Sequence, residues 1–112
     1  MGDQFLRYDI MRLFLMFDLP MQSKADTRNY RHLISQLERE GFVRFQYSVF
    51  TRVCPSRLSA KQLFERLKRD LSFRQGKVAS LMVTEKQFHD IQYLAGNASS
   101  DFRNSADRII IL

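Results

Sequence analysis

The first strong pattern in the chain is an almost uninterrupted apolar run at residues 10–17, Ile-Met-Arg-Leu-Phe-Leu-Met-Phe. A run that is apolar on almost both sides is typical of a strand in the middle of a sheet that helices cover. Asp18-Leu19-Pro20 follows, and Pro20 cannot donate a hydrogen bond to a ladder, so it ends the strand. The pattern therefore predicts a central strand early in the chain.

A helix is the next element that the pattern predicts. Ser23 suits the N-cap position, and Asp26 three residues later favours the positive end of the helix dipole. Gly41 is a natural stop just beyond the last turn. The apolar positions recur at i, i+3, i+4 and i+7 and form one stripe, Tyr30, Leu33, Ile34 and Leu37.

The opposite side of this helix is basic. At 100° per residue its members lie within about a quarter turn of one another. They are Lys24, Arg28, Arg31, Ser35 and Arg39. Such a stripe is either a solvated helix face or a surface that binds phosphate groups, and the spacing fits both.

Residues 42–53 alternate with the period of two that is typical of strands. One side carries Val43, Phe45, Tyr47, Val49, Thr51 and Val53, and the other carries Arg44, Gln46, Ser48 and Arg52. Phe42 and Phe50 are exceptions to this alternation. Twelve residues are long for one strand, so two strands that meet at a bulge or tight turn near Gln46-Tyr47 fit equally well.

A second long helix is predicted over residues 60–72. Ser59-Ala60-Lys61-Gln62 matches a capping box, and Leu58 can pack against Leu63 as a hydrophobic staple. The apolar stripe of this helix is Leu63, Phe64, Leu67 and Leu71. We expect these four side chains to face the sheet.

The last third of the chain predicts a strand over 77–83 and then a short helix. Thr84-Glu85-Lys86-Gln87 is a second capping box, and the helix that it opens is expected to bury Phe88 and Ile91. Residues 96–100 form the most loop-like segment of the chain.

The order of these elements is β-α-β-β-α-β, followed by a short helix and a last strand. This order is typical of the ferredoxin-like α+β fold, a sheet with helices on one face. The last strand, Ile109-Ile110-Ile111-Leu112, is apolar throughout, so both of its faces require burial. It either pairs with the sheet of a second copy, which predicts a homodimer, or closes an edge of its own sheet.

Length and charge narrow the class of protein. The 112 residues allow one domain, 1–112, and carry a net charge of +6, with Arg supplying most of the basic side chains. This composition favours a nucleic-acid partner but also fits a basic surface without a specific partner. The sequence has no apolar run long enough for a membrane helix and no signal-peptide pattern. Cys54 stands alone, which agrees with a reducing compartment such as the cytoplasm.

Most familiar catalytic patterns are absent from the sequence. Cys54, His32 and His89 are isolated and lack the spacing of a zinc site, and both histidines are expected at the surface. There is no glycine-rich phosphate loop and no nucleophile elbow. Asp18 remains, because it lies where a buried strand emerges into a loop. It either binds Mg²⁺, through one or two carboxylates with substrate phosphate and water, or only starts a turn.

Three segments together resemble one known family. They are Met11 to Pro20, Gly41 to Phe50, and Val83 to Phe88 with Tyr93-Leu94-Ala95-Gly96. All three are similar to the small CRISPR-associated subunit that partners the spacer integrase, the second core CRISPR-associated protein family. The most specific part is Arg-x-Gln-x-Ser-Val-Phe, which begins at Arg44. Residues 1–10 have no counterpart in the family, so residues 1–9 are expected to be an N-terminal extension.

The resemblance implies a ferredoxin-like homodimer in which the last strand joins the partner's sheet. It implies a cytoplasmic subunit that binds double-stranded spacer-precursor DNA and bridges integrase dimers. Many members are described as Mg²⁺-dependent endonucleases on RNA or DNA. Asp18 corresponds to the family's acidic residue, which would make it the catalytic metal ligand, and Arg44 to a basic position of its motif. Lys24, Arg28, Arg31 and Arg44 are the candidate nucleic-acid contacts. Phe17 stands where many members carry Tyr, which weakens any role for a hydroxyl there.

Two other small folds share this order of elements. An RNA-recognition domain carries an aromatic motif on its third strand, whereas the faintly similar Glu40 to Phe45 follows the first helix directly. A toxin-type ribonuclease of the same size would act without an integrase. Within the preferred family, the sequence does not distinguish an enzyme from a scaffold.

Overall fold

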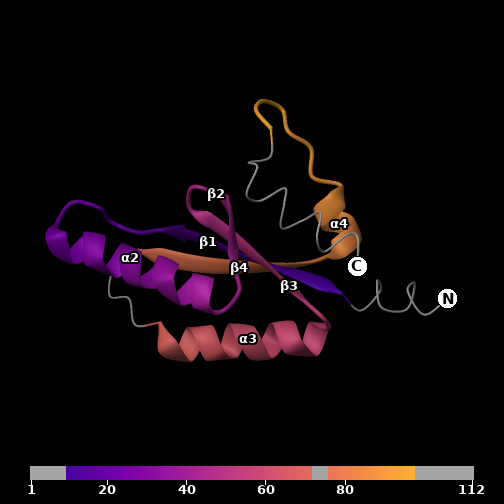
Figure 1. The fold of residues 1–112 in the computed structure, drawn as a ribbon, viewed down its shortest axis with the longest axis horizontal. Helices are drawn as coiled ribbons and strands as arrows, with labels where there is room; N and C mark the ends of the chain where they lie inside the picture. Colours follow the sequence, from indigo (N-terminus) through magenta and orange to yellow (C-terminus); the bar gives the residue numbers. More distant parts are fainter. Residues whose placement is uncertain (1–9, 72–75, 98–112) are drawn as a thin grey trace.

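The computed structural model describes residues 10–71 and 76–97. The N-terminal extension predicted at 1–9 and the strand predicted at 109–112 lie outside the described residues. The described elements run β1 (Met11–Asp18), α2 (Lys24–Arg39), β2 (Val43–Gln46), β3 (Val49–Cys54), α3 (Arg57–Asp70), β4 (Lys77–Thr84) and α4 (Glu85–His89). This order confirms the predicted β-α-β-β-α-β arrangement with a short following helix (Figure 1).

Strand β1 lies inside the sheet, as its apolar run predicts. The four strands follow the order β2-β3-β1-β4. β1 pairs antiparallel with β3 on one side and with β4 on the other, where the register runs from Met11 opposite Thr84 to Asp18 opposite Lys77. Every described neighbour pair is therefore antiparallel, and within the described residues β2 and β4 are the edge strands.

The two faces of the sheet are covered unequally. Helices α2 and α3 lie together on one face, and the short α4 lies on the other (Figure 1). The main core forms under α2 and α3, where Leu13, Leu15 and Phe17 of β1 meet the helices. On the second face Phe14 packs with Phe88 of α4. We call this second side the open face, because α4 covers only part of it.

The first helix begins and ends where the sequence predicts. The Ser23 hydroxyl accepts a hydrogen bond from the Asp26 N–H, and the Asp26 carboxylate accepts one from the Ser23 N–H. Gly41 follows the helix with φ +89°, the left-handed conformation that favours glycine. Leu33 and Leu37 are fully buried.

The second long helix begins earlier than predicted. Ser56, not Ser59, is the N-cap, and Ser59 lies at the third helical position, where it exchanges hydrogen bonds with Ser56. The capping box of this helix is therefore Ser56-Ser59, and helix α3 starts at Arg57. Leu58 is consequently exposed, so the predicted staple against Leu63 is wrong. Leu63 and Leu67 are buried, as expected.

The alternating segment 42–53 is two strands. A tight turn at Tyr47-Ser48 joins them, and the register shifts between Arg44 and Gln46. The shift moves the apolar side chains out of a strict alternation, which is why Phe50 is buried although it breaks the pattern. At the other end of the chain α4 buries Phe88, but Ile91 lies beyond the helix and is exposed, so its predicted burial is wrong.

No helix in the described part of the chain is long and apolar enough to cross a membrane.

Candidate functional site

Asp18 is the last residue of the central strand. It is exposed, and it follows the alternation that places Phe14 and Met16 on the open face. Lys77, the first residue of β4, is its partner across the antiparallel ladder and is also exposed. Residues opposed in this way have Cβ atoms about 5 Å apart. The structure thus places a cation beside the candidate metal ligand, and no pattern in the sequence indicates this pairing.

Gly76 holds the backbone of β4 against Asp18. A Cβ at Gly76 would lie only 2.6 Å from the Asp18 carbonyl oxygen and 2.8 Å from Cδ2 of Leu19. The φ of Gly76 is +89°, which L side chains rarely adopt. The strand end that carries Asp18 is therefore fixed by a close approach that only glycine permits.

The β2–β3 turn lies on the other side of the same strand end. The backbone N–H of Phe17 donates to the Ser48 carbonyl oxygen at 3.0 Å. The end of β1 is thus flanked by the start of β4 and by the Tyr47-Ser48 turn. Phe17 itself is buried and stacks on Phe50, with ring centroids 5.9 Å apart.

Arg44 lies in β2, just before this turn, and is exposed. Its guanidinium carbon lies 4.9 Å from the centre of the Phe50 ring and 5.6 Å from that of Tyr47. Its Nη1 donates to the Tyr47 carbonyl oxygen at 3.3 Å. The Tyr47 ring stacks on Tyr30 of α2, with centroids 6.0 Å apart. The adjacent Tyr30 hydroxyl raises the pKa of Tyr47, so the Tyr47 phenol stays neutral at neutral pH.

The basic stripe of α2 forms a separate surface. Lys24, Arg28 and Arg31 are exposed, and they project away from the side of the helix on which Leu33 and Leu37 are buried. Because that buried side faces the sheet, the stripe points away from the open face that Asp18 follows. The structure therefore does not bring these three residues together with Asp18.

A metal centre is not complete within the described part of one chain. No group of three or more His, Cys, Asp or Glu side chains comes together there. His32 and His89 are exposed, as predicted. A single carboxylate such as Asp18 fits a Mg²⁺ site in which the protein supplies one or two ligands. Water and substrate phosphate would fill the remaining positions.

Arg12 was missed as a special residue, because it sits inside an apolar run. Its side chain is only 1% exposed, and its Nε and Nη2 donate to the two carboxylate oxygens of Glu85 at 2.9 and 2.8 Å. The guanidinium carbon lies 3.9 Å above the Phe88 ring. This contact fixes α4 on the open face. A charged residue within a buried strand was the available signal, since such a residue requires a partner.

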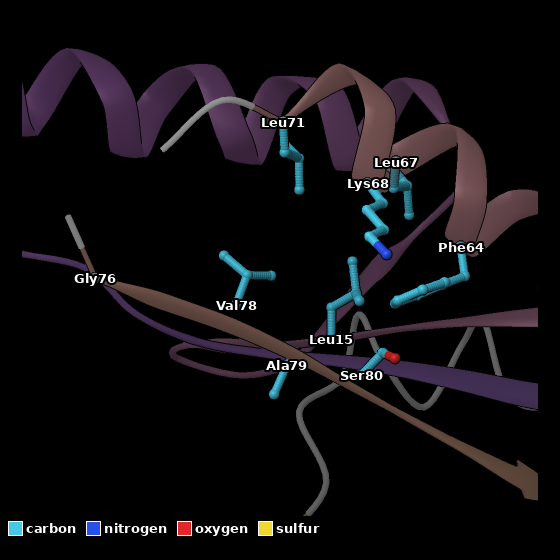
Figure 2. A pocket seen from close by; sticks show the side chains of 9 residues that line it. All are labelled: Leu15, Phe64, Leu67, Lys68, Leu71, Gly76, Val78, Ala79 and Ser80. Carbon is cyan, nitrogen blue, oxygen red and sulfur yellow. The ribbon is translucent and has the colours of Figure 1, made fainter. Parts of the chain in front are cut away.

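A groove of about 320 Å³ lies between α3 and the first half of β4 (Figure 2). Among the described residues Lys68 is the one charged residue that lines it, and most of the other described lining residues are apolar, from Leu15 and Phe64 to Leu71 and Val78. No carboxylate lines the groove within the part of the chain that the structure describes, so these residues do not offer it a carboxylate metal ligand.

Comparison with known proteins gives the family. The model of the family described as "CRISPR associated protein Cas2" matches residues 11–91. The chain belongs to the Cas2 family. A CRISPR-associated endoribonuclease Cas2 from Lacticaseibacillus rhamnosus is 42% identical over 102 residues, which cover 91% of this chain and all of the relative. The Cas2 endoribonuclease of Streptococcus mutans UA159 is 33% identical over 91% of this chain and 93% of its own length.

A solved structure supports the Cas2 fold. A chain described as "Crystal structure of cas2" superimposes with a TM-score of 0.53 and covers 81% of this chain and 92% of its own. The sequences are 20% identical, so this likeness concerns the fold alone. The family match confirms the resemblance that the strand-one, Arg-x-Gln and Thr-Glu-Lys-Gln segments predict.

Proposed function

We propose that this Cas2 chain serves CRISPR spacer acquisition as a homodimer that binds nucleic acid and bridges integrase dimers, and that it also hydrolyses RNA with Mg²⁺ at Asp18. The observation that carries the nuclease proposal is the position of Asp18. It is an exposed carboxylate at the end of the central strand, with Lys77 opposite, in a chain whose relatives are named endoribonucleases.

Asp18 and Lys77 have complementary roles in this proposal. Asp18 would hold Mg²⁺, with the Asp18 of a second copy as the other carboxylate. When bound, Mg²⁺ supplies Lewis-acid polarisation of the phosphoryl oxygen and an activated water. The Lys77 ammonium offsets part of the substrate's negative charge beside the carboxylate, and Gly76 keeps the two strand ends close together.

The open face supports the dimer. Met16 and Leu81 are exposed large apolar residues on it, and Leu81 is 51% exposed. Pairing of this face with its copy would bury them and bring two Asp18 side chains to one interface, since a two-fold axis repeats each residue. The edge strand β4 is the position at which the partner's residues 109–112, outside the described residues, would add a strand.

The basic stripe supports the DNA-binding part of the proposal. Lys24, Arg28 and Arg31 are exposed along one helix, where they can contact successive phosphates of a duplex. Because this surface is separate from Asp18, a duplex could be held without reaching the carboxylate. A cytoplasmic location agrees with Cys54, which is buried and unpaired.

The structure adds an argument against the RNA-recognition alternative. Its motif would need exposed rings on a central strand, whereas Phe42 is buried and β2 is an edge strand. A toxin-type ribonuclease would differ in that it acts without an integrase. A cleavage assay that contains no other protein tests this alternative.

The test is cleavage of labelled RNA and duplex DNA, with and without Mg²⁺, by the wild type and by Asp18→Asn. We expect Mg²⁺-dependent RNA cleavage that Asp18→Asn reduces at least about a hundredfold, since the metal ligand is lost. Asp90→Asn, an exposed aspartate after α4, is the matched control and should cleave normally. Equal cleavage by wild type and Asp18→Asn would contradict the nuclease role. Absent cleavage with intact DNA binding would leave the scaffold role alone.

A further inference from the structure

An exposed aromatic residue lies at the end of the sheet and is not used in the proposed hydrolysis. Tyr47 is 67% exposed although it is a large ring. Its neighbours Phe17, Phe50 and Tyr30 already close this end of the core. Burial therefore does not explain why a tyrosine occupies the tip of the β2–β3 turn.

The surroundings of Tyr47 combine a supported ring with a cation. Tyr30 stacks on it with an interplanar angle of 22°, and the Arg44 guanidinium carbon lies 5.6 Å from its ring centre. Arg44 also donates to the Tyr47 carbonyl oxygen, which ties the turn to the cation. We call Tyr30, Arg44 and Tyr47 the tyrosine patch. A nearly parallel supporting ring and a neighbouring cation hold the Tyr47 ring in one orientation while most of its surface remains open to solvent.

We propose that the tyrosine patch binds an unpaired base of a single-stranded nucleic acid. The base stacks on the Tyr47 ring, and Arg44 contacts the phosphate of the same or the next nucleotide. Stacking on an aromatic side chain requires a base whose face is free, which a fully paired duplex does not offer. The inference deepens the proposed function, since it names the form of nucleic acid that this end of the sheet recognises.

The position of the patch relates it to Asp18. The Phe17–Ser48 hydrogen bond holds the turn beside the strand end that carries Asp18, and adjacent strands lie about 4.8 Å apart. Tyr47 stacks on Tyr30 of α2, on the helix side of the sheet, whereas Asp18 follows the alternation of the open face. The patch and the carboxylate therefore flank the same strand end from opposite faces of the sheet.

The experiment measures binding without cleavage. A single-stranded RNA 12-mer with one 2-aminopurine is titrated with Asp18→Asn protein that carries in addition Tyr47→Ala, Tyr47→Phe or no further change. The same oligonucleotide paired with its complement, and its DNA version, are the comparison probes. We expect Tyr47→Ala to weaken single-strand binding about tenfold and to abolish the quenching of 2-aminopurine, since the stacked base is lost. Tyr47→Phe keeps the ring and should bind within about twofold of the parent.

Tyr93→Ala is the matched control, because Tyr93 is another partly exposed tyrosine that packs on Phe45 at a different place. It should leave single-strand binding unchanged. Equal losses for single strand and duplex in Tyr47→Ala, or no loss at all, would overturn the proposal. The readout is independent of hydrolysis: a wild-type protein that cleaves nothing, but whose single-strand binding depends on the Tyr47 ring, would refute the nuclease role and uphold the patch.

Discussion

The backbone of Gly76 lies so close to the backbone of Asp18 that no side chain fits between them. The missing Cβ would lie 2.6 Å from the Asp18 carbonyl oxygen, so any larger residue must push the strand end away. The backbone oxygen cannot rotate aside as a flexible side chain could. The position of Asp18, the candidate metal ligand, therefore depends on Gly76, which follows it by 58 positions (76 minus 18).

Gly76→Ala tests this dependence. We expect it to lower Mg²⁺-dependent cleavage at least tenfold and to destabilise the fold by about 1 kcal/mol or more, because it adds both a clash and an unfavourable φ. Gly96→Ala is the control, since Gly96 also has a positive φ, +77°, but has no atom within 4 Å of its Cβ position. Cleavage rates and urea unfolding check both variants. Equal cleavage by the two variants would show that the contact at Asp18 does not matter.

At this scale the sequence predicts the individual residues unevenly. Asp18 could be found because it is a carboxylate at the end of an apolar strand. Lys77 and Gly76 could not, since their closeness to Asp18 depends on the β1–β4 register, which no local pattern encodes. Tyr47 looked like one more apolar position of an alternating strand, and only the turn exposes it.

Among the elements, α4 depends most on a single polar contact. Its five residues are too few for a helix to be stable alone. Arg12 of β1 donates two hydrogen bonds to Glu85, and its guanidinium also covers the Phe88 ring. One side chain of β1 therefore contacts two residues of α4. The pair is almost fully buried, which makes the loss of one partner costly.

Arg12→Met should destabilise the protein by about 3–5 kcal/mol, because it removes both hydrogen bonds that Arg12 donates to the largely buried Glu85 carboxylate. Arg66→Met is the matched control. Arg66 binds Glu40 with the same two-bond geometry, at 2.9 Å each, but its side chain is 43% exposed, so its loss should destabilise the protein much less than the loss of Arg12. Urea denaturation of both variants measures the difference. Similar losses of unfolding free energy in the two variants would mean that burial does not determine how much these ion pairs stabilise the protein.

The elements themselves were largely predictable, and the errors have local causes. Ser59 resembles an N-cap, but Ser56 three residues earlier can cap a longer helix and use Ser59 as its reciprocal partner. Helix 60–72 therefore became Arg57–Asp70. Apolar spacing found the buried faces of α2 and α3 well, because the sheet covers one side of each helix.

For the whole molecule, the proposed dimer makes one prediction about residues 109–112. Deleting them should weaken self-association, because the proposed dimer would lose the strand added to the partner's β4 edge and the apolar area that four aliphatic side chains bury there. Sedimentation at low micromolar concentration measures the effect. A deletion variant that stays fully dimeric there would contradict this role. Leu81→Asp, placed on the open face, then shows whether that face contributes to the dimer.

The fold class of the whole molecule was predictable, because the pattern of apolar residues indicates both the order of the elements and the position of the central strand. The separation of surfaces was not. Whether the α2 stripe and Asp18 share one side depends on the packing of α2 across the sheet, and the sequence alone leaves that open.

The strand order also has a consequence for how the chain folds during synthesis. β1 emerges first, but its neighbours are β3 and β4, and the Arg12–Glu85 pair joins residues 73 positions apart. Closing such long loops is slow, so β1 waits with unsatisfied edges while α2 shields one face. A chain truncated before β4 would leave one edge of the apolar central strand without its neighbour, and such an unpaired edge is prone to aggregation.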